Sequence, residues 1–443
     1  MQIQLSDHFT YRRLLRFTFP SIIMMIFTSI YGVVDGIFVS NFVGTTAFAA
    51  INLIMPYIML FGTLGIMVGT GGTALISKTL GEQKEEKAKE LFSMLVYLSI
   101  AGGVVLTILG IALLRPVAVW LGAEGEMLEA CVQYGLFTLP AMTALILQNE
   151  FQCFCTAAEK PNLGLFLTVA AGVTNIVLDA LFVGVWGFGL VGAAVATAIS
   201  QCVGGLVPMV YFARKNGSRL RLVKAGFDGG ALAKTCLNGS SELMSNLSMS
   251  FVSMLYNFQL MRYAGENGVA AYGVLMYVNF IFIAVFLGYS LGSAPVIGYH
   301  YGAGNREELK SLLRKSLRIV LVMSVGLTVA AEVLAAPLSG IFVGYDAQLY
   351  DMTRWAFVVY SLSFLVCGFN MFGSAFFTAL NNGPISAAIS FLRTLVFQTA
   401  AVLLLPVFFD LNGVWWSIIV AEVGALLVTG FCLMKYRGRY HYG

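Results

Sequence analysis

The chain has 443 residues, of which 58% are hydrophobic and only 11% are charged. An ordinary soluble domain has roughly 25% charged residues, so the composition excludes that class and predicts an all-α polytopic membrane protein. The formal net charge of +4 does not indicate nucleic-acid binding, because in membrane proteins the distribution of Lys and Arg matters more than their sum. The seven cysteines lie almost entirely in apolar segments and form no CxxC pair, so the sequence predicts neither a disulfide framework nor a thiolate metal site.

The first residues, MQIQLSDHFTYRRLLRFTFP, run directly into a long apolar stretch without a small-residue cleavage site. We therefore expect the first helix to remain as an anchor. A spanning helix needs about 20 mostly apolar residues, and by that rule the sequence predicts twelve spans. Their approximate ranges are 14–40, 50–77, 91–114, 128–157, 163–184, 189–212, 234–262, 269–299, 312–336, 352–380, 385–407 and 412–434.

Basic residues gather in alternate connections between these spans. When alternate connections are assigned to opposite sides, 22 of the 26 Lys and Arg residues fall on the side that also holds both termini. The other side has Arg115, Arg262 and Arg354, and Arg393 lies within the eleventh span. Connections rich in Lys and Arg face the cytoplasm, so both termini are predicted to be cytoplasmic.

The two halves of the chain repeat at a shift of 221 residues. The matching pairs are Gly44 and Gly265, Ala49 and Ala270, Ala50 and Ala271, Gly71 and Gly292, Gly81 and Gly302, Glu86 and Glu307, Lys89 and Lys310, and Leu91 and Leu312. The longest polar connection separates the halves, which predicts an amino-terminal lobe at 1–213, an inter-lobe linker at 214–233 and a carboxy-terminal lobe at 234–443. Each lobe has six spans, an even number, so the lobes form a parallel repeat with a cleft between them.

Six acidic residues lie within apolar spans: Asp35, Glu150, Asp179, Glu242, Glu332 and Glu422. Such residues are rare in membranes and usually face a protein interior or a water-filled cavity, where they serve proton relays, ion sites or substrate paths. The three histidines lie at the termini or at a loop edge, at positions 8, 300 and 441. Proton chemistry within the membrane is therefore expected to use carboxylates.

Four polar residues of the first half are predicted to lie at a similar depth in the membrane. Asp35 and Asp179 each lie about five residues from the predicted outer end of their span, roughly 8 Å deep by helical rise. Asn175 precedes Asp179 by one helical turn on the same face, and Thr197 lies within about a turn of that level. The four predict a proton or cation site in the outer half of the amino-terminal lobe, because burial and a neighbouring like charge disfavour ionised carboxylates. A structural role, such as capping a broken helix, is the alternative.

Other intramembrane polar residues have two interpretations each. Glu242, in the inner half of the seventh span, is a candidate for attracting a cationic substrate or carrying a proton, and otherwise for a buried hydrogen bond. Further candidates for lining the substrate path, or for bonding a neighbouring helix instead, are Asn246, Asn257, Gln148 and Asn149. Glu150 and Glu422 are candidates for a structural ion pair with Arg393, and Glu332 is expected to reach the membrane interface. The GTGG at 69–72 lacks the Lys and Ser/Thr of a phosphate loop, so no nucleotide or other cofactor is predicted.

Several segments resemble the multidrug and toxic compound extrusion (MATE) family: YGVVDGIFVSNFVGTTAFAAINL, TNIVLDALFVG, GLVGAAVATAIS and GYHYGAGNREELKSLLRKS. NGSSELMSNLSMSFVSMLYNFQL and CTAAEKPNLG are similar to its MepA-like bacterial branch, and the resemblance spans all twelve helices. It implies a monomeric antiporter, not an enzyme, in the bacterial inner membrane. Such a protein exports cationic or amphipathic compounds against protons or sodium and alternates access between two lobes.

The resemblance also implies a role for the four outer residues. In prokaryotic members of the family the amino-terminal lobe holds a cation site, and its positions match Asp35, Asn175, Asp179 and Thr197 here. If sodium is the coupling ion, the resemblance places it at Asp35 and Asp179. Another branch adds an acidic residue in the tenth helix, where this chain has only Asn370. We therefore do not expect a cation site in the second lobe.

Two other functions fit the same architecture less well. A flippase for lipid-linked precursors would need a strongly basic central cavity for pyrophosphate, and Arg393 is the one basic residue deep within a predicted span, away from its ends. A membrane enzyme or receptor would need a catalytic cluster or a sizeable extramembrane domain, and the sequence predicts neither.

Overall fold

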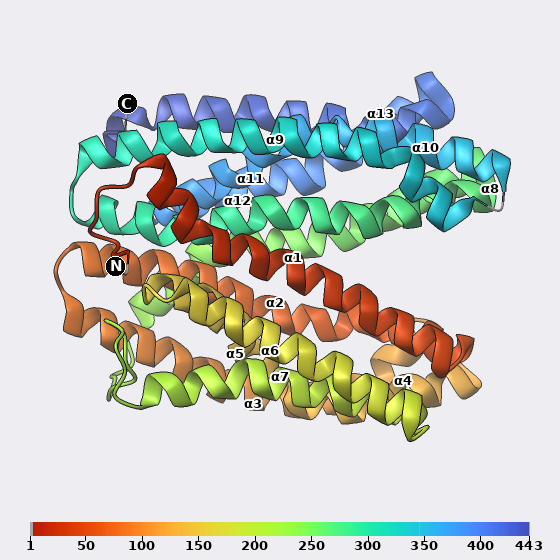
Figure 1. Ribbon diagram of the computed structural model, residues 1–443, viewed down its shortest axis with the longest axis horizontal. Coiled ribbons are helices and arrows are strands. Elements are labelled where there is room, and N and C mark those ends of the chain that lie inside the picture. The colour runs from red at the N-terminus through yellow and green to blue at the C-terminus, as the bar shows by residue number, and fades with distance from the viewer. Residues whose placement is uncertain (1–2, 345, 443) are drawn as a thin grey trace.

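The computed structural model describes residues 3–344 and 346–442, without the side chains at 33, 35–41, 45 and 48. Long helices run side by side from one end of the molecule to the other (Figure 1). The first half comprises α1 (Tyr11–Phe42), α2 (Thr45–Gly81), α3 (Glu85–Trp120), α4 (Gly125–Thr138), η1 (Leu139–Ala141), α5 (Met142–Ala157), α6 (Pro161–Asp179), η2 (Ala180–Val185) and α7 (Gly189–Ala213). The second half comprises α8 (Gly229–Gly302), α9 (Arg306–Val343), α10 (Ala347–Ser361), α11 (Phe364–Ala379), α12 (Gly383–Phe391), η3 (Leu392–Phe397), α13 (Gln398–Lys435) and α14 (Arg437–Tyr440).

The described helices account for twelve membrane crossings. Nine helical segments are long and apolar enough to cross a membrane, and α10 with α11, bent by 47°, makes a tenth. Two of the nine contain a turn, because the backbone leaves the helical conformation at Gly265 in α8 and at Asp410 in α13. Each of these two therefore supplies two crossings. The predicted all-helical, twelve-span architecture is confirmed.

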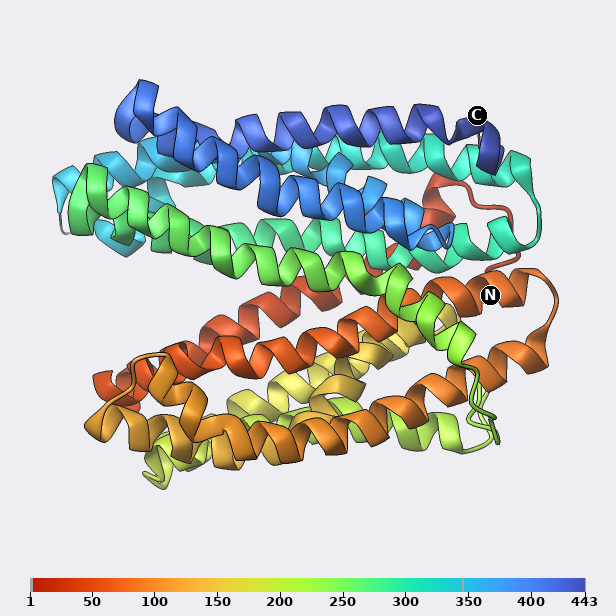
Figure 2. The ribbon, with the colours of Figure 1, turned by 180° about the vertical axis from the view of Figure 1, so that it is seen from behind.

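The helices form two lobes, α1–α7 and α8–α14, which lie one above the other in Figures 1 and 2. The connection between them packs on the first lobe, where Leu220 is buried and Val223 N donates a hydrogen bond to Ser93 Oγ over 2.8 Å. Helix α8 begins earlier than the predicted span because Asp228 caps it, accepting a hydrogen bond from Ala231 N over 3.0 Å. Such a cap satisfies an amide of the first turn that has no partner within the helix.

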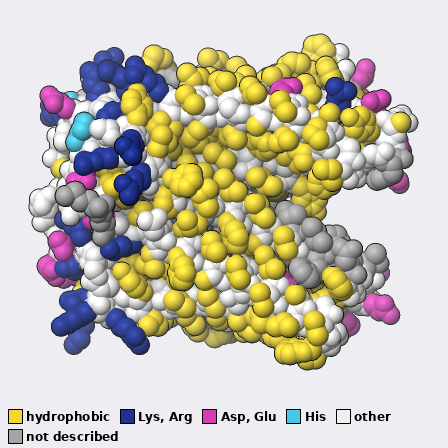
Figure 3. Space-filling view, viewed as in Figure 1, with side chains coloured by type: hydrophobic (Ala, Val, Ile, Leu, Met, Phe, Trp, Pro, Cys, Tyr) yellow, Lys and Arg dark blue, Asp and Glu magenta, His cyan; other side chains and the backbone are white. Residues whose placement is uncertain are grey.

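Lys and Arg side chains gather at the end of the molecule that holds both termini, which we call the basic end (Figure 3). There the lobes touch through α2 and α8, a contact we call the seam. A Cβ on Gly81 would clash with the carbonyl oxygen of Tyr299, and a Cβ on Gly302 would clash with that of Lys78. The two contacts are related by the 221-residue repeat, because Gly81 corresponds to Gly302 and Lys78 corresponds to Tyr299. The reciprocity supports the duplication and shows two backbones in direct contact.

At the opposite end the lobes separate, and Figure 3 shows the surface hollowed between them. We call this opening the hollow. Because the lobes meet at the seam and diverge away from it, the molecule is closed at the basic end and open at the other.

Residues 3–10, the N-terminal strap, bind both lobes at the basic end. Leu5 N donates a 2.8 Å hydrogen bond to Glu159 Oε1, in the connection between α5 and α6 of the first lobe. Phe9 N donates a 2.9 Å hydrogen bond to Glu308 Oε1, in α9 of the second lobe. The Leu5 and Phe9 side chains are fully buried. The strap therefore joins the two lobes on the side where the molecule is closed.

Replacing Glu308 with Ala is expected to release the strap from the second lobe. The Glu308 carboxylate accepts the Phe9 amide and also lies 2.6 Å from Nδ1 of His8. Hydrogen bonds to a charged group contribute about 1.5–3 kcal/mol each, so hydrogen–deuterium exchange over residues 3–10 should accelerate by about tenfold or more. Glu307→Ala, which changes the exposed neighbouring glutamate, is the control. Equal exchange in the two variants would show that Glu308 does not hold the strap.

Candidate cation site

Helix α6 carries Asn175 and Asp179 on one face, as the spacing predicts, and their side chains are 2% and 0% exposed. Directly after Asp179 the helix widens into the π-helix η2. Short π-helical turns interrupt the regular hydrogen-bond ladder and are frequent at functional sites. The aspartate is thus held inside the first lobe at an irregular turn.

Helix α6 lies against α1, the helix that contains position 35. Gly172 permits the approach, because a Cβ there would clash with the Phe27 ring and lie 3.1 Å from Cδ1 of Tyr31. Gly172 is about one turn from Asn175, so α1 comes close beside the predicted site. The side chain of Asp35 lies outside the described residues. Its contact with Asp179 stays a prediction.

Two of the predicted ligands present polar atoms to the interior. The Thr197 hydroxyl in α7 and the Asn175 side-chain nitrogen are buried without a hydrogen-bond partner among the described residues. Thr63 and Thr174, by contrast, each donate to the carbonyl four residues earlier, over 2.9 and 2.7 Å. Buried polar atoms without protein partners are uncommon, and a site that binds an ion or a water molecule accounts for them. Among the described residues no group of three or more His, Cys, Asp or Glu lies close enough to hold a metal ion.

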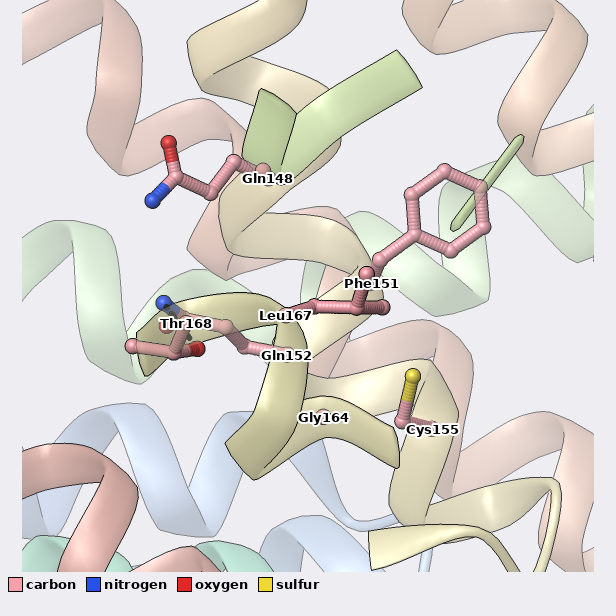
Figure 4. Close-up of a pocket in the computed structure, with 8 residues that line it drawn as sticks. Gln148, Phe151, Gln152, Cys155, Gly164, Leu167 and Thr168 are labelled. Carbon is pink, nitrogen blue, oxygen red and sulfur yellow. Dashed lines mark hydrogen bonds between the residues drawn. The ribbon is translucent and has the colours of Figure 1, made fainter. Parts of the chain in front are cut away.

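Two substrate-path candidates are engaged within the first lobe. Gln148 is buried and lines a cavity of about 10 Å³, enough for about one water molecule. In Figure 4 its amide lies on the same side of this cavity as Gln152 and Thr168, with the Phe151 ring on the other side. Asn149 Nδ2 donates a 2.9 Å hydrogen bond to the Gly62 carbonyl and so joins α5 to α2. Asn149 thus makes the bond to a neighbouring helix that was the alternative interpretation, whereas the Gln148 side-chain oxygen is buried without a hydrogen-bond partner among the described residues.

The remaining candidates lie along α8. Glu242 follows Gly239, where a Cβ would clash with the carbonyl of Met67 across the seam. Three residues advance a helix by about 4.5 Å, so the partly exposed Glu242 lies about one helical turn beyond this contact. Asn246 Nδ2 donates a 2.9 Å hydrogen bond to the Glu242 carbonyl of its own helix. Asn257, also partly exposed, lies farther along α8.

The second lobe contains a buried ion pair. Arg393 Nε, in the π-helix η3, lies 2.8 and 3.0 Å from the two carboxylate oxygens of Glu422. Asn370 Nδ2 donates to the same carboxylate over 2.7 Å, and Thr429 donates to Asn370 over 3.1 Å. The predicted pair of Arg393 with Glu422 is confirmed. The alternative partner, Glu150, lies in α5 of the first lobe, outside this pair.

Two results differ from the sequence reasoning. Glu332 accepts a 2.8 Å hydrogen bond from Ser361 Oγ, so it bonds α10, where we expected it to extend to the interface. The acid beside Asn370 was also missed, because Glu422 comes from α13 and not from the helix of Asn370. The presence of Arg393 within a span indicated that it needs an anion such as Glu422, but it gave no indication that Asn370 bonds the same carboxylate.

Comparisons with known proteins agree with this geometry. The profile of the MatE family matches residues 20–181 and 243–402, one segment in each lobe. The multidrug export protein MepA of Staphylococcus aureus (strain MRSA252) is 24% identical over 415 residues, which cover 93% of this chain and 91% of MepA. MepA of Staphylococcus saprophyticus is 24% identical over 441 residues, covering 97% and 94%.

Solved structures share the fold. One described as an outward-facing conformation of a multidrug resistance MATE family transporter superposes with a TM-score of 0.93, 24% identity and coverage of 98% of each chain. A MOP superfamily transporter from Pyrococcus furiosus Vc1 (DSM3638) superposes with a TM-score of 0.90, 25% identity and coverage of 98% of this chain and 96% of that one. Since the family profile spans more than half of the residues and both lobes, the chain belongs to the MatE family, whose members are secondary transporters and not enzymes.

Proposed function

We propose that the protein exports cationic or amphipathic compounds in exchange for protons or sodium ions. The observation that carries the proposal is the buried face of Asn175 and Asp179, which ends at a π-helical turn beside α1. An intramembrane carboxylate in such a position is a functional-site hypothesis by default. The name of the MepA relatives, multidrug export protein, supports the class of substrate. Because the Arg393 side chain is paired with Glu422, a basic cavity for a lipid pyrophosphate has less support.

The orientation follows from the charge distribution. We assign the basic end to the cytoplasm, because cytoplasmic connections are enriched in Lys and Arg. The hollow then opens to the outside of a bacterial plasma membrane, and the protein is in the state that releases substrate and accepts the coupling ion. A single chain contains both lobes, which fits function as a monomer.

The mechanism couples the ion to the two arrangements of the lobes. A cation that enters from the hollow binds at Asp35 and Asp179, with Asn175 and Thr197 supplying neutral polar atoms. Neutralising the carboxylates favours the arrangement in which the hollow closes and the seam opens, and the ion then leaves to the cytoplasm. Only a difference in affinity between the two arrangements couples ion and substrate.

The test measures efflux of an organic cation from vesicles that contain the purified protein. A pH gradient and a sodium gradient are imposed in turn, with the membrane potential clamped. One of the two gradients should drive efflux, and that gradient identifies the coupling ion. If neither gradient drives efflux above that of protein-free vesicles, the proposed antiport is wrong.

A further inference from the structure

Two pairs of arginines lie on the surface of the basic end, one pair from each lobe. Arg12 and Arg16 are exposed on α1, and Arg314 and Arg318 are exposed on α9. The members of each pair are four residues apart, so they lie on one face of their helix. We call the two pairs the arginine rows. They meet where α1 begins beside α9 (Figure 1), because Arg318 Nη1 donates a 3.0 Å hydrogen bond to the Tyr11 hydroxyl.

The protein itself supplies no anion to the arginine rows. Within the described part of the chain, none of the four guanidinium groups lies within 4 Å of a carboxylate, whereas Lys89 at the same end lies 3.1 Å from Glu85 and 2.8 Å from Glu86. The carboxylate of Glu308, in the same helix as the second row, is already engaged by the strap. Like charges that gather on one surface repel each other, so an anion from outside the protein would relieve this repulsion.

The internal repeat shows that a lobe does not need these cations for its own packing. The positions 221 residues before Arg314 and Arg318 are Ser93 and Tyr97 of α3. Both of these residues bond the connection between the lobes, because Val223 N donates to Ser93 Oγ over 2.8 Å and the Tyr97 hydroxyl donates to the Val223 carbonyl over 3.2 Å. This face of α3 therefore binds protein, whereas the corresponding face of α9 carries exposed positive charge.

Each arginine row continues into exposed apolar side chains. Phe19 follows Arg16 by about one turn of α1, and Val322 follows Arg318 by one turn of α9. The two arginines lie at the cytoplasmic ends of their predicted spans, so their guanidinium groups reach the level of the lipid head groups. The apolar side chains then lie at the level of the acyl chains. A phospholipid has its phosphate and its chains in this same order.

We propose that the arginine rows bind an anionic phospholipid of the cytoplasmic leaflet, which bridges the two lobes while the basic end is closed. The choice of leaflet rests on the proposed orientation, in which the basic end is cytoplasmic. A guanidinium group can bond a phosphate through two parallel hydrogen bonds, and basic clusters beside membrane spans attract anionic head groups. A ligand that contacts both lobes binds best when the two rows lie together, so by linkage it stabilises the closed seam.

Binding is tested with phosphatidylglycerol and the purified protein in detergent, by native mass spectrometry of the retained lipid. Arg16→Gln combined with Arg314→Gln removes one exposed charge from each row and should weaken binding by about tenfold or more. Lysine at the same two positions keeps the charges and should retain most of the binding. The control, Arg214→Gln with Lys215→Gln, removes the same charge from the exposed start of the inter-lobe connection and should bind as the wild type does.

Two outcomes of this measurement would overturn the site. Equal loss of lipid from the test pair and the control pair would show that net charge alone attracts the lipid. Displacement of the lipid by excess inorganic phosphate would show that the apolar side chains contribute nothing, so that the ligand is not a lipid.

The bridge between the lobes is tested by hydrogen–deuterium exchange over residues 3–10 in nanodiscs. In the wild type these residues should exchange about fivefold or more slowly in phosphatidylglycerol than in phosphatidylcholine. The difference should vanish when Arg16 and Arg314 are both replaced by Gln, and a difference that persists in this variant would refute the bridge. Neither measurement requires transport, so a failure of the antiport test would leave both results standing.

Discussion

Replacing Asp179 with Asn should abolish ion-driven export of an organic cation, down to the level of vesicles that lack the protein. Asn has nearly the same shape and keeps one oxygen, but it neither gains nor loses a proton and carries no charge to attract sodium. Because Asp179 is fully buried at the end of α6, bulk water cannot replace its charge. Both efflux of the organic cation and the opposing ion flux should disappear together, as measured in vesicles under the gradient that drives the wild type.

The stability of the Asp179 variant separates a functional from a structural role. A carboxylate kept for transport is buried at a cost, so the neutral Asn should leave the melting temperature unchanged or raise it. If Asp179 instead satisfied the backbone at η2, its loss should destabilise the protein, typically by 1–3 kcal/mol. Asp351→Asn, an exposed change in α10, is the control for both measurements. Full transport by Asp179→Asn would remove the central residue of the proposed site.

The number and kind of helices could be predicted because the membrane allows few alternatives. Backbone polar groups in hydrocarbon must bond internally, so each long apolar segment has to be a helix, and composition identifies the segments. The irregular turns could not be predicted. The π-helices η2 and η3, and the break between α10 and α11, depend on how neighbouring helices pack, and no local residue pattern encodes them.

The site was predictable where helical spacing alone decides it. Asn175 and Asp179 share a face because they are four residues apart, whatever the surroundings. The direction of Gln148 was not predictable, since the consecutive polar residues Gln148, Asn149 and Glu150 point to different sides of α5. The rotation of the helix depends instead on close contact with Gly204 of α7. The N-terminal strap was also missed, because Glu159 and Glu308 bind main-chain amides, and such contacts leave no trace in the residue types of the strap.

A methyl group at Gly81 is expected to push the lobes apart at the basic end. Its Cβ would clash with the Tyr299 carbonyl oxygen, and the repeat-related Gly302 has the same relation to Lys78. A backbone carbonyl within a helix cannot rotate away as a side chain can, so α2 and α8 must separate. Overpacking of this kind costs about 1–3 kcal/mol. The penalty applies only while the seam is closed, so it shifts the equilibrium toward the open seam by about 5- to 150-fold.

The shift is measured as a distance between spin labels at Glu86 and Glu307, exposed repeat-related positions at the basic ends of α3 and α9. Gly81→Ala should increase the population of long distances and slow export, because the state that releases substrate becomes rarer. Gly102→Ala and Gly326→Ala, where a Cβ meets no atom within 4 Å, should leave the distances unchanged. If Gly81→Ala behaved like these controls, direct backbone contact would not be what closes the seam. If it increased the distances without slowing export, opening of the seam would not limit the transport cycle.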